Sequence, residues 1–167
     1  MNIGAIRILG VDPGLRNTGW GLIEVTGSRL AYVACGSVKT ETGTALAERL
    51  AIIHRALAKL IVDERPDEGA VEETFVNRDP QSALKLGQAR GVALAALSVG
   101  GLPVAEYAAN LIKKTVVGVG HAEKDQVAMM IKMLLPLSEA RTPDAADALA
   151  VAICHAQHRR ARARGAA

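Results

Sequence analysis

The sequence has few residues of several types, and each scarcity excludes a class of protein. Only two cysteines, Cys35 and Cys154, occur in 167 residues, which is too few for a disulfide framework. Four residues are aromatic and 30 are alanine, so aliphatic side chains must build the core. Half of the residues are hydrophobic, which is typical of a folded domain and not of a disordered chain. The length favours a single domain with a sizeable core.

Long apolar runs are also missing. The longest stretch without charge, 91–105, has 15 residues and contains Gly100, Gly101 and Pro103. A membrane-spanning helix needs about 20 apolar residues, so we expect no membrane crossing. Residues 1–8 lack the apolar run of a secretion signal, and we therefore expect the protein to work in the reducing cytoplasm.

Charge is nearly balanced overall but unevenly distributed. Residues 1–158 hold 16 basic and 17 acidic groups, and the net charge of +3 comes from four arginines that follow them. We expect one domain over 1–158 and a basic, flexible tail over 159–167. Residues 41–73 carry eight carboxylates against four bases, whereas residues 84–132 carry six bases against three acids. Such segregation indicates a polyanionic partner together with a metal.

Hydrophobic periodicity and turn residues predict the element order βββαβαβαα. The expected strands are 6–11, 18–25, 30–38, 70–75 and 103–107, and the expected helices are 44–65, 80–98, 122–135 and 143 to about 160. Three hairpin-like strands come first, and later strands alternate with helices. This order predicts an α/β fold in which helices pack on a mixed sheet.

Acidic residues stand at the ends of two apolar strands. Asp12 ends the first strand and precedes Pro13 and Gly14, although an Asp before Pro-Gly is also common in plain turns. Glu72 and Glu73 end a later strand. Because side chains alternate across a strand, at most one of these glutamates shares a site with Asp12.

The last helix carries two more acids. Thr142 is placed to cap this helix and Pro143 to occupy its first turn. Asp144 has an ordinary explanation, since an acid near a helix N-terminus gains about 0.3 to 1 kcal/mol from the helix dipole. Asp147 lies beyond the first turn among alanines and Leu149, where an unpaired buried carboxylate is costly. Its position therefore favours a functional role.

Convergence of these acids predicts a divalent metal. Two carboxylates about 4 Å apart repel by about 4 kcal/mol at an effective dielectric of 20, so the group must take up protons or bind cations. Oxygen ligands without clustered Cys or His favour Mg²⁺ or Mn²⁺ over zinc. His155 lies about 12 Å along the helix from Asp147, too far to join the same site. Two ions in such a site suit phosphodiester cleavage, which is nuclease chemistry.

Several segments together are similar to a known family. They are 10–14 (GVDPG), 18–21 (TGWG), 71–72 with Phe75, 82–91 (SALKLGQARG), 115–120 (TVVGVG), 122–124 and 144–150 (DAADALA). In these segments the chain resembles the RuvC-type Holliday-junction resolvases over nearly its whole length.

The resemblance implies a ribonuclease H-like fold, with a mixed five-stranded sheet flanked by helices. It implies a homodimeric endonuclease that uses two Mg²⁺ ions, with Mn²⁺ as a substitute. Such an enzyme makes paired symmetric nicks in four-way DNA junctions during recombination and repair, and leaves 5′-phosphate and 3′-hydroxyl ends. The resemblance also implies a branch-migration helicase complex as a partner.

The resemblance assigns roles to individual residues. It implies that four acids bind the metals and catalyse cleavage: Asp12, Glu72, Asp144 and Asp147. It thereby selects Glu72 over Glu73. It also implies that Phe75 stacks on bases near the junction, and that Lys113 and Lys124 lie near the scissile phosphate.

Other DNA contacts follow from the residues themselves. Lys113, Lys114 and Lys124 flank a glycine-containing loop, 118–120, where backbone amides can approach a phosphate, although a plain solvated loop has the same composition. Lys85 and Arg90 are further candidates for phosphate contacts.

A stripe of small residues on the helix 80–98 has two interpretations. Gly87, Gly91 and Ala95 recur every four residues and fit close packing within the chain as well as a dimer contact.

Two other functions fit parts of the pattern. An actin-like ATPase also places a Gly-x-Asp-x-Gly turn after its first strand, but such enzymes close two related domains over the nucleotide, and this chain has room for one. A non-catalytic junction-binding module would use the same carboxylates as helix caps and turn formers.

Overall fold

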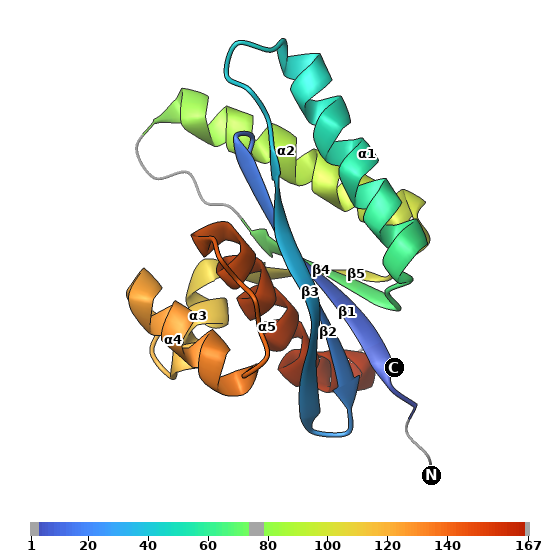
Figure 1. Cartoon of the computed structure of the whole chain (residues 1–167), viewed down its shortest axis with the longest axis vertical. Helices are drawn as coiled ribbons and strands as arrows, with labels where there is room; N and C mark the ends of the chain where they lie inside the picture. Colours follow the sequence, from blue (N-terminus) through green and yellow to red (C-terminus); the bar gives the residue numbers. More distant parts are fainter. Residues whose placement is uncertain (1–3, 74–78, 166–167) are drawn as a thin grey trace.

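A computed structural model describes residues 4–73 and 79–165, and a five-stranded sheet lies at its centre (Figure 1). The strands are β1 (Ile6–Asp12), β2 (Asn17–Thr26), β3 (Arg29–Lys39), β4 (Glu68–Glu73) and β5 (Val104–Ala108). Their order in the sheet is β3-β2-β1-β4-β5. The first three strands pair antiparallel, and β4 pairs parallel to both β1 and β5. The predicted mixed sheet is confirmed.

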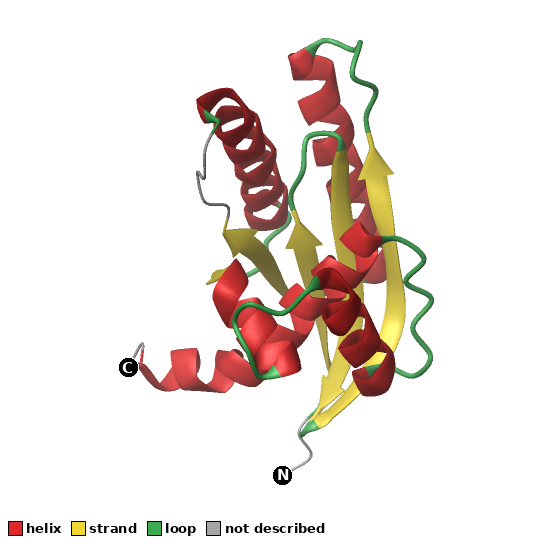
Figure 2. Ribbon diagram, turned by 90° about the vertical axis from the view of Figure 1, so that its left-hand side faces the viewer, coloured by secondary structure: helices red, strands yellow, loops and turns green. Residues whose placement is uncertain are grey.

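Helices cover both faces of the sheet (Figure 2). They are α1 (Leu46–Glu64), α2 (Pro80–Val99), α3 (Ala109–Val117), α4 (Lys124–Leu134) and α5 (Pro143–Gly165). On one face α1 packs against α2, and buried residues such as Ile53 and Leu97 join the inner strands in one apolar cluster. On the other face α5 lies on the strands, and α3 and α4 pack against it. In the described part of the chain, no helix is long and apolar enough to span a membrane.

The predicted element order is wrong by one helix, because α3 follows β5 directly. Its first turn receives no side-chain cap, since the N-cap residue is Ala108. The helix ends at Val117, and its C-cap residue Gly118 has a φ of 92°, in the left-handed region that favours glycine. A strand that runs straight into a helix gives none of the turn or cap signals by which a helix start is predicted.

The last helix is longer than expected. It continues to Gly165, five residues past the predicted end near 160. Arg159, which we placed in the flexible tail, donates a hydrogen bond to Glu68 on β4, with Nε 2.9 Å from Oε2. This arginine is therefore attached to the sheet. The division of the chain into a domain and a tail at residue 158 stays a prediction.

Candidate active site

Two acids meet at the carboxyl edge of the sheet because β1 and β4 are parallel neighbours. The register pairs Val11 with Val71, so the next residues along the two strands, Asp12 and Glu72, lie side by side. Glu73 does not line the pocket that these two residues share. Glu72, the glutamate that the family resemblance implies, is the one that lines the pocket.

Side-chain hydrogen bonds hold the turn that follows Asp12. The Thr18 hydroxyl donates to the Gly14 carbonyl oxygen at 2.7 Å and accepts from the Gly14 amide at 3.3 Å. The Thr40 hydroxyl donates to the Leu15 carbonyl oxygen at 2.6 Å. These contacts fix the backbone beside the acid, because both carbonyls belong to the turn.

Glycines in β1 and β2 let α5 lie directly on the sheet. A Cβ added at Gly19 would stand 2.0 Å from the carbonyl oxygen of Asp144, and one at Gly10 would stand 2.3 Å from that of Ala148. Neither position has room for a side chain. The close approach brings the start of α5, with Asp144 and Asp147, toward the end of β1.

The start of α5 forms as predicted. The Ala145 amide donates to the Thr142 hydroxyl at 3.3 Å, and Pro143 is the first helical residue. Asp144 therefore lies in the first turn and Asp147 one turn further on, as the sequence spacing requires.

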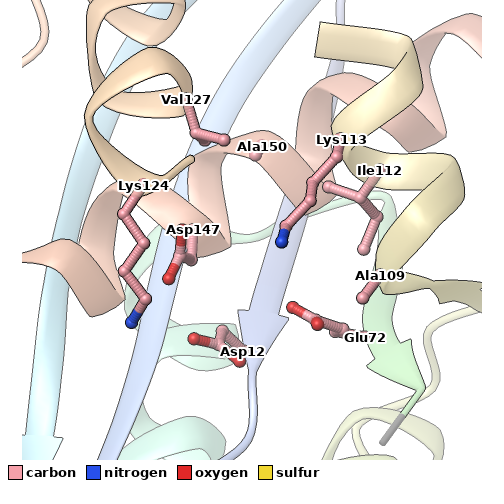
Figure 3. Close-up of a pocket in the computed structure, with 9 residues that line it drawn as sticks. All are labelled: Asp12, Glu72, Ala109, Ile112, Lys113, Lys124, Val127, Asp147 and Ala150. Atoms are coloured by element: carbon pink, nitrogen blue, oxygen red, sulfur yellow. The ribbon is translucent and has the colours of Figure 1, made fainter. Parts of the chain in front are cut away.

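A cavity of about 270 Å³ collects three of the four predicted acids. Its lining residues are Asp12, Glu72, Ala109, Ile112, Lys113, Lys124, Val127, Asp147 and Ala150. In Figure 3 the carboxyl groups of Asp12, Glu72 and Asp147 face one shared space, and the ammonium groups of Lys113 and Lys124 point toward it from α3 and α4. Asp144 does not line the cavity, but its charge acts on Asp12 and Asp147.

Burial and mutual repulsion make this group of acids hard to ionise. Burial, together with the charges of Glu72, Asp147 and Asp144, raises the pKa of Asp12 to about 8, against the opposing charge of Lys124. Burial and the charge of Asp147 raise the pKa of Glu72 to about 7, against the opposing effects of Lys113 and a hydrogen bond with Asp12. The pKa of Asp147 is also raised, mainly by burial. The site therefore binds protons or attracts added positive charge.

The chemistry of these donors fits a hard divalent cation. The acids supply only oxygen ligands, which suit Mg²⁺ and Mn²⁺. As placed, the described residues form no group of three Asp, Glu, His or Cys side chains that could hold an ion. Binding would therefore require at least one carboxylate to move closer to the others. The shared cavity and the raised pKa values of Asp12 and Glu72 favour such closure around a cation.

The predicted basic residues fall into two groups. Lys113 lines the cavity from the middle of α3, and Lys124 lines it as the first residue of α4. Both flank the loop 118–120, as predicted; Lys124 lies in the predicted helix, whereas the helix that carries Lys113 was not predicted. Lys114 is exposed on α3 and does not line the cavity.

The remaining predicted DNA contacts lie elsewhere. Lys85 is exposed on α2, and the Arg90 guanidinium donates to Glu106 on β5, with Nε 2.9 Å from Oε1. Phe75 lies outside the described residues. The DNA-binding roles of all these residues stay predictions.

Sequence reasoning missed the apolar wall of the cavity. Ala109 and Ile112 contribute from α3, and Val127 and Ala150 from α4 and α5. Because α3 itself was not predicted, its lining residues had no assigned place. The buried pair Ile112 and Val116, four residues apart, is the signal that indicates this helix.

Comparison with known proteins identifies the family. The model of the crossover junction endodeoxyribonuclease RuvC family matches residues 8–155. The chain belongs to this family. The RuvC of Methylocella silvestris is 70% identical over 163 residues, which cover 98% of this chain and 93% of that protein. A RuvC of Rhodopseudomonas palustris, strain BisA53, is 63% identical over 159 residues, which cover 95% of this chain and 91% of that protein.

Solved RuvC structures match the fold. The RuvC of T. thermophilus in complex with a Holliday junction substrate aligns with a TM-score of 0.86 and 36% identity, over 94% of this chain and 96% of that chain. A second structure of Thermus thermophilus RuvC gives a TM-score of 0.83 at 35% identity, over 94% of this chain and 97% of that chain. The predicted ribonuclease H-like fold is confirmed, and the ATPase alternative is excluded.

Proposed function

We propose that this RuvC family member is a Mg²⁺-dependent Holliday-junction resolvase that makes paired symmetric nicks in four-way DNA junctions. One observation carries the proposal: Asp12, Glu72 and Asp147 share a cavity with two lysines, in a chain that aligns closely with a RuvC solved on a junction. Converging carboxylates that can hold divalent cations, beside ammonium groups that suit a phosphate, fit metal-assisted phosphodiester hydrolysis.

Four acids are the proposed metal ligands. Two Mg²⁺ ions, or Mn²⁺ in their place, would be held by Asp12, Glu72, Asp144 and Asp147. When bound, the metal supplies Lewis-acid activation of water and stabilisation of the leaving 3′ oxygen, which gives 5′-phosphate and 3′-hydroxyl ends.

The chain's own side chains position the DNA for this reaction. Lys113 and Lys124 project their ammonium groups into the cavity (Figure 3) and can donate hydrogen bonds to the scissile phosphate. Ile112 and Val127 form an apolar wall that limits the water around the acids. The base-stacking role of Phe75 belongs to the same proposal, and so do further phosphate contacts by Lys114, Lys85 and Arg90.

An open helix face supports the homodimer. On α2, a Cβ added at Gly87 or Gly91 would have no neighbour within 4 Å among the described residues. Close packing against the described part of the chain therefore does not explain these two glycines. Leu84 is 65% exposed beside them and lines an apolar hollow of about 460 Å³. A second copy on this face would place two active sites about a two-fold axis, which matches the approximate symmetry of a junction.

Two further parts of the proposal do not depend on the cavity. A branch-migration helicase complex is the partner that the family resemblance implies. The cytoplasm is the expected compartment because the sequence has few cysteines and its first residues lack the apolar run of a secretion signal.

The proposal is tested by mapping the nicks that the purified protein makes in a synthetic mobile four-way junction with Mg²⁺. We expect two nicks at symmetry-related positions on opposed strands, no nicks in the presence of a chelator, and far slower cutting of a linear duplex of the same sequence. Equal rates on junction and duplex would contradict the assignment. Tight junction binding without nicks would favour the non-catalytic module instead.

A further inference from the structure

A second polar cluster lies at the opposite end of β4 from Glu72. The His155 side chain of α5 places Nε2 at 2.7 Å from Oε2 of Glu68, and its Nδ1 lies 2.8 Å from the Tyr107 hydroxyl oxygen. Arg159 makes two contacts with the same glutamate, one through Nε at 2.9 Å and one through Nη2. His155 and Tyr107 are 5% and 2% exposed. The cluster is therefore largely buried and joins α5 to β4 and β5.

Each hydrogen bond in this cluster can be assigned a donor and an acceptor without conflict. The His155 Nε2–H group donates to the Glu68 carboxylate, because a carboxylate can only accept. With neutral His155, the Tyr107 hydroxyl then donates to Nδ1. Hydrogen bonds from Arg159 lower the pKa of Glu68, so this glutamate is ionised at neutral pH. An ionised acid that bridges a histidine and an arginine makes strong charge-assisted hydrogen bonds.

The cluster and the candidate active site both connect β4 with α5, and the distance between the two sites is nearly the same along the strand and along the helix. Glu68 precedes Glu72 by four residues, about 13 Å along β4. His155 follows Asp147 by eight residues, about 12 Å along α5. Strand and helix therefore meet at two points, Glu72 with Asp147 and Glu68 with His155. Two such points fix both the sliding position and the tilt of α5 on the sheet.

The two meeting points have opposite electrostatic character. At the active site the charge of Asp147 raises the pKa of Glu72, so the two acids repel each other. At the other end Glu68 attracts Arg159, and His155 bonds to it. Repulsion at one end of a helix tends to lift that end from the sheet. An attachment two turns further along limits this movement.

We propose that Glu68, His155 and Arg159 are positioning residues for metal binding, which hold α5 on β4 so that Asp147 stays opposite Glu72. This inference rests on the proposed metal-dependent function. None of the three residues lines the cavity, so their effect on the metal passes through the position of the helix.

The test is a Mn²⁺ titration of the DNA-free protein, with the free ion followed by electron paramagnetic resonance. Glu68→Gln keeps the shape of the side chain and removes its charge, and the milder Arg159→Gln removes one partner only. The matched control is Glu106→Gln, which breaks the partly buried Arg90–Glu106 ion pair between α2 and β5. Circular dichroism checks that each variant is folded.

We expect both cluster variants to raise the Kd for Mn²⁺ about tenfold, within the range known for residues that orient metal ligands. The control Glu106→Gln should change the Kd for Mn²⁺ by less than about twofold, even if it lowers the Tm as much as the cluster variants do. In junction cutting, saturating Mg²⁺ should restore the kcat of both variants. An unchanged Kd in both cluster variants, beside a wild type that binds Mn²⁺, overturns the inference alone. A wild type that binds no Mn²⁺ overturns the proposed function, and the inference with it.

Discussion

Replacement of Asp147 by asparagine is expected to lower the rate of junction cutting by 10²- to 10³-fold or more, which is on the order of the cost of removing one preorganised electrostatic group from an active site. Asn has the same shape as Asp, so α5 should stay in place on Gly10 and Gly19. What is lost is one negative charge in the cavity that Asp147 shares with Asp12 and Glu72.

Junction affinity separates this effect from a loss of DNA binding. Because the substitution removes a charge that repels phosphate, the affinity of Asp147→Asn for the junction should equal or exceed that of the wild type. Asp63→Asn is the control, since Asp63 is exposed on α1 and pairs with Lys59. Single-turnover cutting and a gel-shift titration measure the two properties. Wild-type cutting by Asp147→Asn would eliminate the metal mechanism.

Asp12→Asn is expected to stabilise the metal-free protein, and more so at higher pH. The pKa of Asp12 is about 8 in the folded state against an ordinary value of 3.8. Between these values the folded state holds a proton that the unfolded state has released. Stability of the wild type therefore falls as pH rises through this window, and the loss is complete above pH 8. Glu72, with a pKa of about 7, adds to the same trend.

The measurement is the Tm with a chelator present, at pH 5 and at pH 8.5. Asp12→Asn should raise the Tm by roughly 5 to 10 °C at the higher pH and by much less at the lower one. In separate samples without chelator, added Mg²⁺ should raise the Tm of the wild type at pH 8.5 and have little effect on the variant. A difference in Tm between the two proteins that does not depend on pH would mean that ionisation of Asp12 is not what destabilises the folded wild type. Asp63→Asn again serves as the exposed control.

Local sequence patterns predicted the elements that carry the acids. Asp12 ends an apolar strand before a Pro-Gly turn, and Asp147 follows a Thr-Pro helix start, so both could be placed from neighbouring residues alone. The structure brings both to one cavity with Glu72. The choice between Glu72 and Glu73 required the family resemblance, because strand alternation only shows that the two point to opposite faces.

Contacts between distant segments could not be predicted in this way. Glu68 and His155 are 87 residues apart in the chain, and no periodicity links them. Arg159 sits among arginines and alanines that are typical of a solvated tail, and only the course of α5 brings it to β4. The need for glycine at positions 10 and 19 is explained only by the structure, in which the backbone of α5 lies directly against both residues. These contacts between distant residues arise from tertiary packing and cannot be read from local sequence patterns.

Crystals soaked in Mn²⁺ test the central claim most directly, through the anomalous scattering of the metal. The account predicts manganese in the cavity lined by Asp12 and Glu72, bound by their oxygens and by at least one acid of α5, Asp144 or Asp147. Crystals in which these carboxylates stay apart and no manganese appears among them, at concentrations that support junction cutting, would contradict it.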